Sequence, residues 1–329
     1  MARKIRGKIT GLGSFAPTHR LTNLDFERMV ETSDEWIKSR TGIVERRVSK
    51  PEDEASDMAV AAARQAMNMA QAAPEEIDLI LVATVTPDYR LPSQACIVQK
   101  KMGMKNAAAM DIAAACAGFL NGISIADAYI KSGQFRKILV IGAEKLSSIT
   151  DYKDRNTCVL FGDGAGAVII EPTEDERGIL STFLKSDGRF AELLWIPDGG
   201  SKYPYQSLNG SDPRVYIKMN GSEVFKHAVR MMGDASLKVL EDAGLTGEDV
   251  TLMVPHQANI RIIESTAKRV GIPMEKVYLN IAYYGNTSAA SVPLALDEAL
   301  RNGKVKENDI ILMAAFGGGL TWSAAVVRW

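Results

Sequence analysis

The stretch Asp111-Ile-Ala-Ala-Ala-Cys116-Ala-Gly-Phe-Leu120 joins a short apolar run directly to a long helical pattern. A thiol at a helix start lies near unpaired backbone N–H groups and the positive end of the helix dipole, which both favour the thiolate. The thiolate is the form that attacks a carbonyl carbon. The following residues, 118 to 131, carry no charge before Asp127, which predicts a buried helix. Cys116 is therefore a candidate nucleophile, although free cysteines are more often small buried hydrophobes.

The second half of the chain repeats the pattern around Cys116. Cys116 and Gly133 are 17 residues apart, and so are Asn286 and Gly303; an apolar run, 138–141 or 310–315, follows each. Upstream, the apolar runs 79–84 and 252–255 lead to Thr86 and His256, which lie 30 residues before Cys116 and Asn286. This self-similarity predicts a duplicated α/β unit. Chance similarity between two ordinary strand–helix–strand units is the alternative.

The proposed duplication also predicts how the two halves are arranged. The strands are continuous apolar runs, as in sheets that helices cover on their faces. A pseudo-twofold axis between the halves brings the two helix starts, with Cys116 and Asn286, towards one cleft. We expect one half to comprise residues 1–172 and the other residues 173–329.

Composition restricts the classes of function. The chain has 329 residues, of which 46% are hydrophobic and 24% charged, as in soluble globular proteins, and a length of about two domains. With 39 basic and 40 acidic residues the net charge is −1, so we expect no nucleic-acid partner. We expect no signal peptide and no membrane span, because no apolar stretch reaches about 18 residues. Three widely spaced cysteines suggest no disulfide framework, which favours the cytoplasm.

Three further features are candidates for a site with Cys116. His256 follows a short strand in Val254-Pro-His-Gln-Ala-Asn, Asn286 precedes a helix, and three glycines follow Phe316 at the end of a buried strand. Backbone N–H groups in such a glycine loop can point at a substrate oxygen. Each feature also has an ordinary explanation, namely a structural histidine, a helix N-cap or a turn. No metal-ligand spacing is present, and we expect no metal and no cofactor.

The chain resembles the β-ketoacyl-acyl carrier protein synthase III family almost from end to end. The matching segments are Thr32-Ser-Asp-Glu-Trp-Ile, Arg40-Thr-Gly-Ile, Ala113-Ala-Ala-Cys-Ala-Gly-Phe, Phe161-Gly-Asp-Gly-Ala-Gly-Ala, Val254-Pro-His-Gln-Ala-Asn, Gly285-Asn-Thr-Ser-Ala-Ala-Ser-Val-Pro and Phe316-Gly-Gly-Gly. The resemblance implies a thiolase fold, in which two duplicated α/β halves form α-β-α-β-α layers. It also implies a Cys-His-Asn set, whereas the elongating synthases use Cys-His-His and thiolases a second cysteine.

The activity implied by this resemblance is a decarboxylative condensation that initiates fatty-acid synthesis. Cys116 takes an acyl group from acyl-CoA, and the backbone N–H groups of Cys116 and Gly318 hold the oxyanion. His256 and Asn286 then donate hydrogen bonds to the thioester carbonyl of malonyl-acyl carrier protein, so that loss of CO₂ leaves a stabilised enolate. Coenzyme A enters only as the thioester substrate.

The resemblance further assigns residues to each substrate. Trp36 stacks on the coenzyme A adenine, and Asn259 forms a hydrogen bond with the pantetheine arm. The nucleotide end is contacted by Thr32, Arg40 and Arg155. Without the resemblance, residues 32–40 predict a capping box that starts a short amphipathic helix with an inward tryptophan. The acidic carrier protein would meet a basic surface in and around the helix after His256. That surface comprises Lys226, Gln257, Ala258, Asn259, Ile260, Arg261, Lys268 and Arg269.

The acyl primer and the pathway are left open by the sequence. Leu91 lies where the family places a residue at the far end of the acyl pocket, across the interface of a homodimer. Leucine there allows acetyl, branched or longer primers. The glycines of 161–167 lead into a strand-like segment rather than a helix, so we interpret them as allowing close packing, not as a nucleotide loop. The alternatives are a related synthase of secondary metabolism, a papain-like hydrolase and a binding protein that has lost catalysis.

Overall fold

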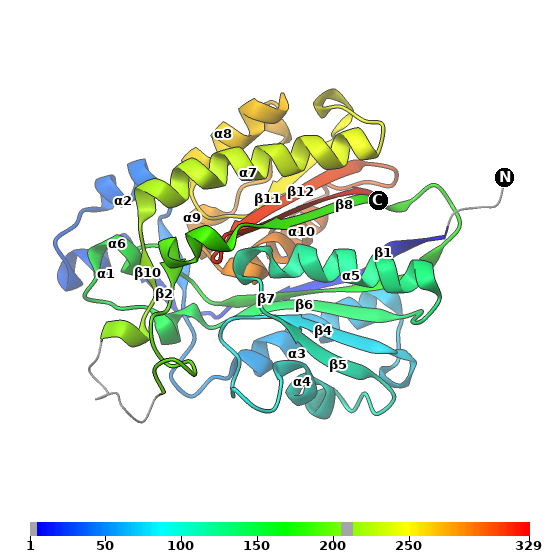
Figure 1. The fold of residues 1–329 in the computed structure, drawn as a ribbon, viewed down its shortest axis with the longest axis horizontal. Coiled ribbons are helices and arrows are strands. Elements are labelled where there is room, and N and C mark those ends of the chain that lie inside the picture. The colour runs from blue at the N-terminus through cyan, green and yellow to red at the C-terminus, as the bar shows by residue number, and fades with distance from the viewer. Residues whose placement is uncertain (1–4, 205–212) are drawn as a thin grey trace.

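The protein folds into five alternating layers of helices and sheets. The computed structural model describes residues 5–204 and 213–329. Helices α3 (Ala55–Ala70) and α4 (Gln94–Met102) cover one sheet, α7 (Gly221–Asp242) and α8 (Ile260–Val270) cover the other, and α5 (Gly118–Ser132) and α10 (Ser291–Arg301) lie between the sheets (Figure 1). The predicted α-β-α-β-α thiolase architecture is confirmed.

The first sheet has five strands in the order β1-β7-β6-β4-β5. They are β1 (Arg6–Phe15), β4 (Leu79–Ala83), β5 (Ala108–Ile112), β6 (Ile138–Glu144) and β7 (Gly164–Thr173). β4 pairs in parallel with β5 and β6, and β7 is antiparallel to β6 and β1. β4 and β6 are buried along their whole lengths, as expected for a sheet covered on both faces.

The second sheet has the same plan with one strand fewer. Its order is β11-β12-β13-β8, formed by β8 (Gly178–Ser186), β11 (Leu252–Pro255), β12 (Ile310–Gly317) and β13 (Thr321–Arg328). β11 and β12 are parallel, and β13 is antiparallel to β12 and β8. Beside β11, a single parallel bridge between Met253 and Val277 stands where the first sheet has β5.

Strand register establishes the duplication residue by residue. Leu79 pairs with Ile138 in the first sheet, and Leu252 with Ile311 in the second, so the β4–β6 pair is repeated 173 positions later as β11–β12. The outer strand of each sheet carries a bulge at the corresponding place, next to Ile9 in β1 and next to Ile179 in β8. Because even the irregularities repeat, the two halves are copies of one α/β unit.

The same register corrects the pairing of residues that the sequence spacing suggested. The short 3₁₀ helix η2 (Ala115–Ala117) precedes α5, and η9 (Ser288–Ala290) precedes α10. Their first residues, Ala115 and Ser288, both have positive φ angles, 45° and 48°. With the 173-residue offset, Cys116 therefore corresponds to Ala289. The expected equivalence of Cys116 with Asn286 is wrong by three residues, because α10 is about one turn shorter than α5.

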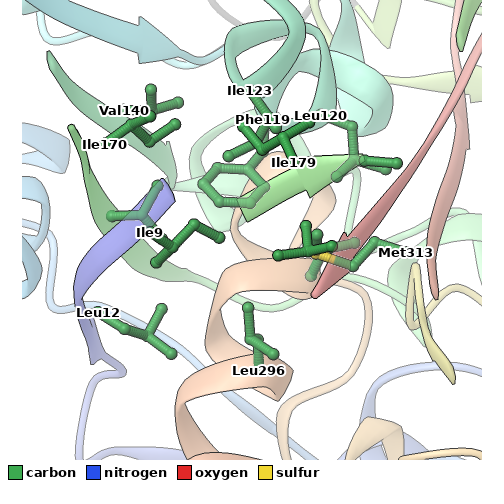
Figure 2. Packing of buried hydrophobic residues seen from close by; sticks show 14 of the residues in the cluster. Ile9, Leu12, Phe119, Leu120, Ile123, Val140, Ile170, Ile179, Leu296 and Met313 are labelled. Carbon is green, nitrogen blue, oxygen red and sulfur yellow. The ribbon is translucent and has the colours of Figure 1, made fainter. Parts of the chain in front are cut away.

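Three hydrophobic clusters hold the layers together. The central cluster packs α5 and α10 between the facing surfaces of both sheets, and Figure 2 shows Phe119 of α5, Leu296 of α10 and Met313 of β12 pointing into it. A second cluster joins α7 and α8 to the outer face of the second sheet, and a third joins α3 and α4 to the first. The predicted burial of the helix after Cys116 is confirmed, since most of α5 lies in the central cluster.

Shorter elements gather at the end of the molecule where Cys116 lies. They are β2 (Arg20–Thr22), α1 (Asn23–Met29), α2 (Asp34–Thr41), β3 (Glu45–Arg47), η3 (Leu146–Ile149), α6 (Arg155–Cys158), η4 (Gly188–Leu193), β9 (Leu194–Trp195), η6 (Pro213–Val215), β10 (Lys218–Met219) and α9 (Ile281–Tyr284). The remaining 3₁₀ turns are η1 (Pro74–Glu76), η7 (Gly247–Asp249) and η8 (Met274–Lys276). α2 contacts α8, and α9 contacts β3, so this end joins segments from both halves.

The chain crosses from the first sheet to the second between β7, which ends at Thr173, and β8, which begins at Gly178. The division into residues 1–172 and 173–329 stays a prediction; this crossing lies next to it.

Within the described residues, none of the helices has the length and apolar character that spanning a membrane requires.

Candidate functional site

Cys116 lies in η2, immediately before the first turn of α5. The preceding residue, Ala115, has a φ of 45°, a conformation that L residues rarely adopt. Across from it, Gly317 at the end of β12 approaches so closely that a Cβ there would lie 2.6 Å from the Cys116 nitrogen. The cysteine is thus held at a helix start by a strained turn and by a glycine of the other half.

The Cys116 thiol is protonated in the free protein. Burial raises its pKa to about 12, the hydrogen-bonding interaction with Ser288 lowers it, and the nearby charge of Glu144 raises it. The helix start favours the thiolate as expected, but its effect does not offset burial, and the thiol must give up its proton during the reaction.

His256 follows β11 and is only 2% exposed. Burial lowers the pKa of its imidazole to about 3, so the ring is neutral. Its Nδ1 is 2.6 Å from the Ser291 hydroxyl, which also accepts a hydrogen bond from the Gln257 N–H at 3.0 Å. Because that hydroxyl still has its own proton to donate, it can donate to Nδ1, which leaves the ring proton on Nε2.

Asn286 is fixed by the backbone on both sides of its side chain. Its N–H donates to the Leu160 carbonyl at 2.8 Å, and its carbonyl accepts from the Gly162 N–H at 3.0 Å. Its side-chain oxygen accepts a hydrogen bond from the Ser288 N–H at 2.8 Å. The amide oxygen is therefore used within the protein, and the NH₂ group is the part available to a ligand.

One cavity brings the three predicted residues together. It has a volume of about 850 Å³, and its lining includes Cys116, His256 and Asn286. The same cavity extends to Trp36 and Arg40. The three residues are buried, whereas Arg40 is exposed, so the cavity leads from the surface to the thiol.

A second cavity of about 370 Å³ adjoins Cys116. It is largely apolar, and both Gly318 and Ser288 contribute to its lining. Phe161, from the glycine-rich segment, lines both cavities. Cys116 therefore stands between a long cavity that reaches the surface and an apolar one, with the predicted oxyanion residue Gly318 beside the second.

The glycines after Phe161 bring the two halves into contact, as we expected. A Cβ at Gly162 would lie 2.2 Å from the Tyr284 carbonyl oxygen, and one at Gly166 would lie 2.6 Å from Pro293. These approaches are too close for any side chain, so the prediction of close backbone packing is confirmed.

Trp36 lines the outer part of the long cavity, and Arg155 packs against it. The Arg155 guanidinium lies over the Trp36 ring, 4.5 Å from its centroid. The helix that carries Trp36, α2, begins one residue later than we expected: its N-cap is Ser33, whose hydroxyl accepts from the Trp36 N–H at 3.1 Å, and there is no capping box from Thr32. Within the described residues, the buried Thr32 hydroxyl oxygen has no hydrogen-bond partner.

Asn259 connects α2 to α8. It is the N-cap of α8, accepting from the Arg261 N–H at 2.9 Å, and its Nδ2 donates to the Arg40 carbonyl at 2.9 Å. Both residues line the long cavity. One N–H of the Asn259 amide remains for a ligand, because the group has two.

Gln257 differs from the expectation that it would meet a carrier protein. It is 1% exposed, its Nε2 donates to the carbonyls of Pro255 and Tyr278, and its Oε1 accepts from the N–H groups of Asn280 and Ile281. These bonds use its side chain fully inside the protein. Ala258 and Ile260 are partly buried, so they offer limited surface.

The four predicted basic residues are all exposed, but two are paired with acids. Lys226 pairs with Glu223 at 2.6 Å, and Arg269 pairs with Asp234. Arg261 lies over the Phe225 ring, 5.4 Å from its centroid, at the cavity, and Lys268 lies seven residues further along the same face of α8. Of the four, Arg261 and Lys268 have no acidic partner among the ion pairs of the described residues, although the exposed Glu264 lies between them on α8.

Leu91 does not line either cavity of the single chain and is 87% exposed. It belongs to the loop between β4 and α4. Its predicted contact with the acyl group of a partner subunit stays a prediction.

Sequence reasoning missed Glu144, Ser288 and Ser291. Glu144 ends the apolar strand β6 and is fully buried, which raises the pKa of its carboxyl to about 7. Ser288 and Ser291 belong to the motif around Asn286 but were not considered individually. The available signal was the single acidic residue at the end of an apolar strand, because such a residue is costly to bury.

In residues 5–204 and 213–329, no group of three or more histidine, cysteine, aspartate or glutamate side chains is arranged to hold a metal ion. The three cysteines are free.

The fold and the site define a thiolase-fold enzyme with cysteine, histidine and asparagine around one cavity. Two family models match: the one described as 3-oxoacyl-[acyl-carrier-protein (ACP)] synthase III over residues 110–188 and its C-terminal counterpart over residues 240–329. A β-ketoacyl-[acyl-carrier-protein] synthase III of Caldanaerobacter subterraneus is 51% identical over 329 residues, which are 100% of this chain and 99% of that protein.

Solved structures agree with this assignment. The 3-oxoacyl-[acyl-carrier-protein] synthase III of Aquifex aeolicus superposes with a TM-score of 0.91 at 51% identity, over 98% of this chain and 100% of that one. The priming β-ketosynthase of the R1128 polyketide pathway gives the same TM-score at 36% identity, over 98% and 96% of the two chains. The chain belongs to the β-ketoacyl-[acyl-carrier-protein] synthase III family. It is an acyltransferase of the condensing type.

Proposed function

We propose that the protein condenses an acyl-CoA primer with malonyl-acyl carrier protein and so initiates fatty-acid synthesis. The observation that carries the proposal is the meeting of Cys116, His256 and Asn286 on one surface-connected cavity. A synthase of secondary metabolism is not favoured, because the polyketide relative is 36% identical, against 51% for the Aquifex aeolicus synthase. The reaction requires no metal and no cofactor; coenzyme A is a substrate.

Cys116 is the nucleophile of the proposed first step. Its sulfur attacks the acyl-CoA carbonyl, forming a thioester as coenzyme A leaves. The N–H groups of Cys116 and Gly318 stabilise the oxyanion. The apolar cavity of about 370 Å³ receives the acyl chain, since it opens beside the same sulfur.

His256 and Asn286 act in the proposed second step. The Asn286 amide oxygen is used by the Ser288 N–H, so its NH₂ group donates to the malonyl thioester carbonyl. His256 donates from Nε2, because Ser291 binds its Nδ1. Two neutral donors stabilise the enolate left by decarboxylation, and each such donor contributes about 10²–10³-fold in rate.

Coenzyme A enters along the outer part of the long cavity in this proposal. Trp36 and Arg155 already stack on one another, so the adenine enters between them by displacing the guanidinium from the ring. Arg40 offers its exposed charge, and Asn259 offers its remaining amide N–H to the pantetheine arm. The contact that the resemblance assigns to Thr32 requires the loop before α2 to move, because its hydroxyl oxygen is buried.

The carrier protein docks on α8 around Arg261 and Lys268. Arg261 is exposed and lines the cavity, and Lys268 is exposed further along the same helix; an acidic partner requires such cations. Lys226 and Arg269 contribute less, because Glu223 and Asp234 neutralise them.

The protein forms a homodimer through the β5 edge of the first sheet. β5 is the last strand of its sheet, and Met110 on it is 38% exposed. Tyr89 and Leu91, in the adjoining loop, are 54% and 87% exposed. An unpaired edge flanked by exposed apolar side chains is a surface that a second copy covers. Leu91 then reaches the partner's acyl pocket.

A cytoplasmic location agrees with the free cysteines.

A two-stage assay tests the proposed function. Acetyl-CoA alone should give a burst of free coenzyme A equal to the enzyme concentration, and malonyl-acyl carrier protein should then give continuous turnover to a β-ketoacyl product. Cys116→Ala should lose both stages. Cys96→Ala, which changes a free cysteine outside both cavities, is the matched control and should keep them. Turnover without a β-ketoacyl product, or a burst in Cys116→Ala, would refute the proposal.

A further inference from the structure

Gln257 directly follows His256, is only 1% exposed, and has no part in the chemistry described above. Its side-chain amide has two N–H donors and an oxygen that accepts two hydrogen bonds, and all four are used inside the protein. The partners are two carbonyl oxygens and two N–H groups, which leaves a single orientation for the amide. Because nothing on this side chain remains for a ligand, its contribution lies in the segments that it connects.

The Nε2 group of Gln257 joins the end of β11 to the segment that follows η8. It donates to the Pro255 carbonyl at 2.8 Å and to the Tyr278 carbonyl at 3.1 Å. The Tyr278 N–H donates in turn to the carbonyl of Met253 in β11 at 2.9 Å. The segment after η8 is thereby fixed beside the strand that leads to His256.

The Oε1 atom of Gln257 holds the start of α9. It accepts hydrogen bonds from the N–H groups of Asn280 at 3.0 Å and Ile281 at 3.2 Å, which are the N-cap and the first residue of that helix. α9 has only four residues, and the N–H of its C-cap, Gly285, donates to the Ile281 carbonyl at 3.0 Å. Asn286 is the next residue, so one short turn of helix connects the Gln257 oxygen to the backbone of Asn286.

The main chain of Gln257 is connected to the imidazole of His256. Its N–H donates to the Ser291 hydroxyl at 3.0 Å, and the same hydroxyl lies 2.6 Å from Nδ1 of His256. Ser291 thus connects the imidazole to the helix after Asn286, and the Gln257 amide connects the same part of the chain to the helix before Asn286.

These links are needed because the other contacts of the two side chains lead to different halves of the molecule. The His256 N–H donates to the carbonyl of Ala314 in β12 at 2.8 Å, which fixes His256 to the second sheet. The backbone of Asn286 is bonded to Leu160 and Gly162 of the first half. The spacing between the His256 and Asn286 side chains therefore depends on connections within the second half.

We propose that Gln257 is a positioning residue, which fixes the spacing between the His256 and Asn286 side chains through α9 and so acts on malonyl decarboxylation. The inference rests on the proposed function, and it replaces the carrier-protein contact that the family resemblance assigned to Gln257. Both donors must reach one enolate oxygen in this step, and misplacement by about 1 Å costs on the order of 10²-fold in rate. Acylation uses Cys116 and the Gly318 N–H, and the side-chain hydrogen bonds of Gln257 involve neither.

The experiment compares the two chemical steps in Gln257→Glu. The carboxylate keeps an oxygen for the N–H groups of α9, but its other oxygen faces the Pro255 and Tyr278 carbonyls, to which it cannot donate. The kcat for release of CO₂ from malonyl-acyl carrier protein should fall by about 10²-fold. The KM for malonyl-acyl carrier protein and the rate of the coenzyme A burst should stay unchanged. Rates are expressed per acylated site, because the size of the burst counts the folded molecules.

A second variant, Gln257→Asn, makes the same test without introducing a charge. It keeps the amide but is one methylene shorter, so the amide cannot reach the partners on both sides. The same separation of the two steps is expected, with a lower kcat for decarboxylation and a normal burst.

A double-mutant cycle with Asn286→Ala tests whether Gln257 acts through Asn286. Once the Asn286 amide is absent, its position no longer matters, so Gln257→Glu should slow CO₂ release little further. A purely structural role would give the same loss with and without Asn286.

Gln94→Glu is the matched control, since it makes the same change at another buried glutamine. Gln94 is 0% exposed, its Oε1 accepts from the Asp88 N–H at 2.8 Å, and its Nε2 donates to Oδ1 of Asp88 at 3.1 Å. It lines neither cavity. This variant should be less stable and should keep the normal rate of CO₂ release per acylated site.

Three results would overturn the inference. They are an unchanged kcat for decarboxylation in both Gln257 variants, a raised KM for malonyl-acyl carrier protein with kcat unchanged, and an equal loss with and without Asn286. Loss of the acylation burst in both variants would also contradict it. Absence of any malonyl-dependent product in the unchanged enzyme would refute the proposed function instead.

Discussion

The two halves place the same turn at the site and use it for different purposes. In the first half the turn is Ala115–Ala117 with Cys116 at its centre; in the second it is Ser288–Ala290 with Ala289 there. Both begin with a residue at positive φ, 45° and 48°. The backbone was therefore retained while the side chains diverged: one turn presents the nucleophile, and the other places Ser288, whose hydroxyl donates to Glu144, beside the same cavity.

Each turn is supported by a strand end of the opposite half. Gly317 of β12 lies against the Cys116 turn, and Glu144 of β6 hydrogen-bonds to the Ser288 turn. With the 173-residue offset these two positions correspond. A glycine allows the oxyanion loop to approach the sulfur, and a carboxylate reaches the serine. The asymmetry of the site therefore resides in three pairs of positions: 115 and 288, 116 and 289, 144 and 317.

Moving the cysteine to the other turn should have the largest effect. Cys116→Ala combined with Ala289→Cys keeps one thiol at an equivalent backbone position, yet we expect a loss of condensation on the order of 10⁴-fold or more. The relocated thiol would have no Gly317–Gly318 loop facing it. The rate of β-ketoacyl product formation measures this. Appreciable activity would show that the halves are chemically interchangeable, contrary to this account.

Glu144→Gln should change how stability depends on pH. The pKa of Glu144 is raised from 4.5 to about 7, so its folded-state preference for the proton stabilises the protein below pH 4.5 and is lost as the pH rises to 7. The glutamine variant lacks this loss. The free energy of unfolding of the variant, relative to that of the unchanged protein, should therefore rise by about 3 kcal/mol between pH 4.5 and pH 8. Denaturant unfolding at both pH values measures the difference; an equal effect at the two would contradict the raised pKa.

Adding a methyl group behind each turn should separate the two chemical steps. A Cβ at Gly317 would lie 2.6 Å from the Cys116 nitrogen, and one at Gly142 would lie 2.2 Å from the Ala289 oxygen. Each alanine variant should lose about 1–3 kcal/mol of stability, the usual effect of overpacking. We expect Gly317→Ala to slow the coenzyme A burst most and Gly142→Ala to slow malonyl decarboxylation most. The same step affected in both would argue against a division of labour.

Reversing one surface charge should have the smallest effect. Arg261→Glu should raise the KM for malonyl-acyl carrier protein several-fold without changing the acetyl-CoA burst, and added salt should reduce the difference. Lys238→Glu is the matched control, because Lys238 lies near the C-terminal end of the neighbouring helix α7, outside the cavity lining. If both variants behave alike, docking does not involve the start of α8.

Most of the fold was predictable, because continuous apolar strands and a repeated pattern both survive in the sequence. The register of the repeat was not. The equal spacings to Gly133 and Gly303 paired Cys116 with Asn286, but α10 has 11 residues and α5 has 15, so the coincidence came from helices of unequal length. Helix length depends on packing across the sheets, which one sequence does not reveal.

The residues that line the site were also recognisable, whereas their electrostatics were not. The helix start at Cys116 favours a thiolate, but burial by the surrounding layers raises the pKa of the thiol to about 12. The family resemblance assigned Gln257 to the carrier-protein surface, although its side chain makes four internal hydrogen bonds. Both outcomes depend on segments distant in the chain, which local patterns do not contain.

Acyl transfer through Cys116 is tested by locating the acyl group on the protein and following its fate. The protein is incubated with isotope-labelled acetyl-CoA, and the label is assigned to a peptide by mass spectrometry before and after malonyl-acyl carrier protein is added. The account predicts the label on Cys116, its transfer to product in the unchanged enzyme and its retention on Cys116 in Asn286→Ala. A label on any other residue, or equally fast transfer in Asn286→Ala, would contradict it.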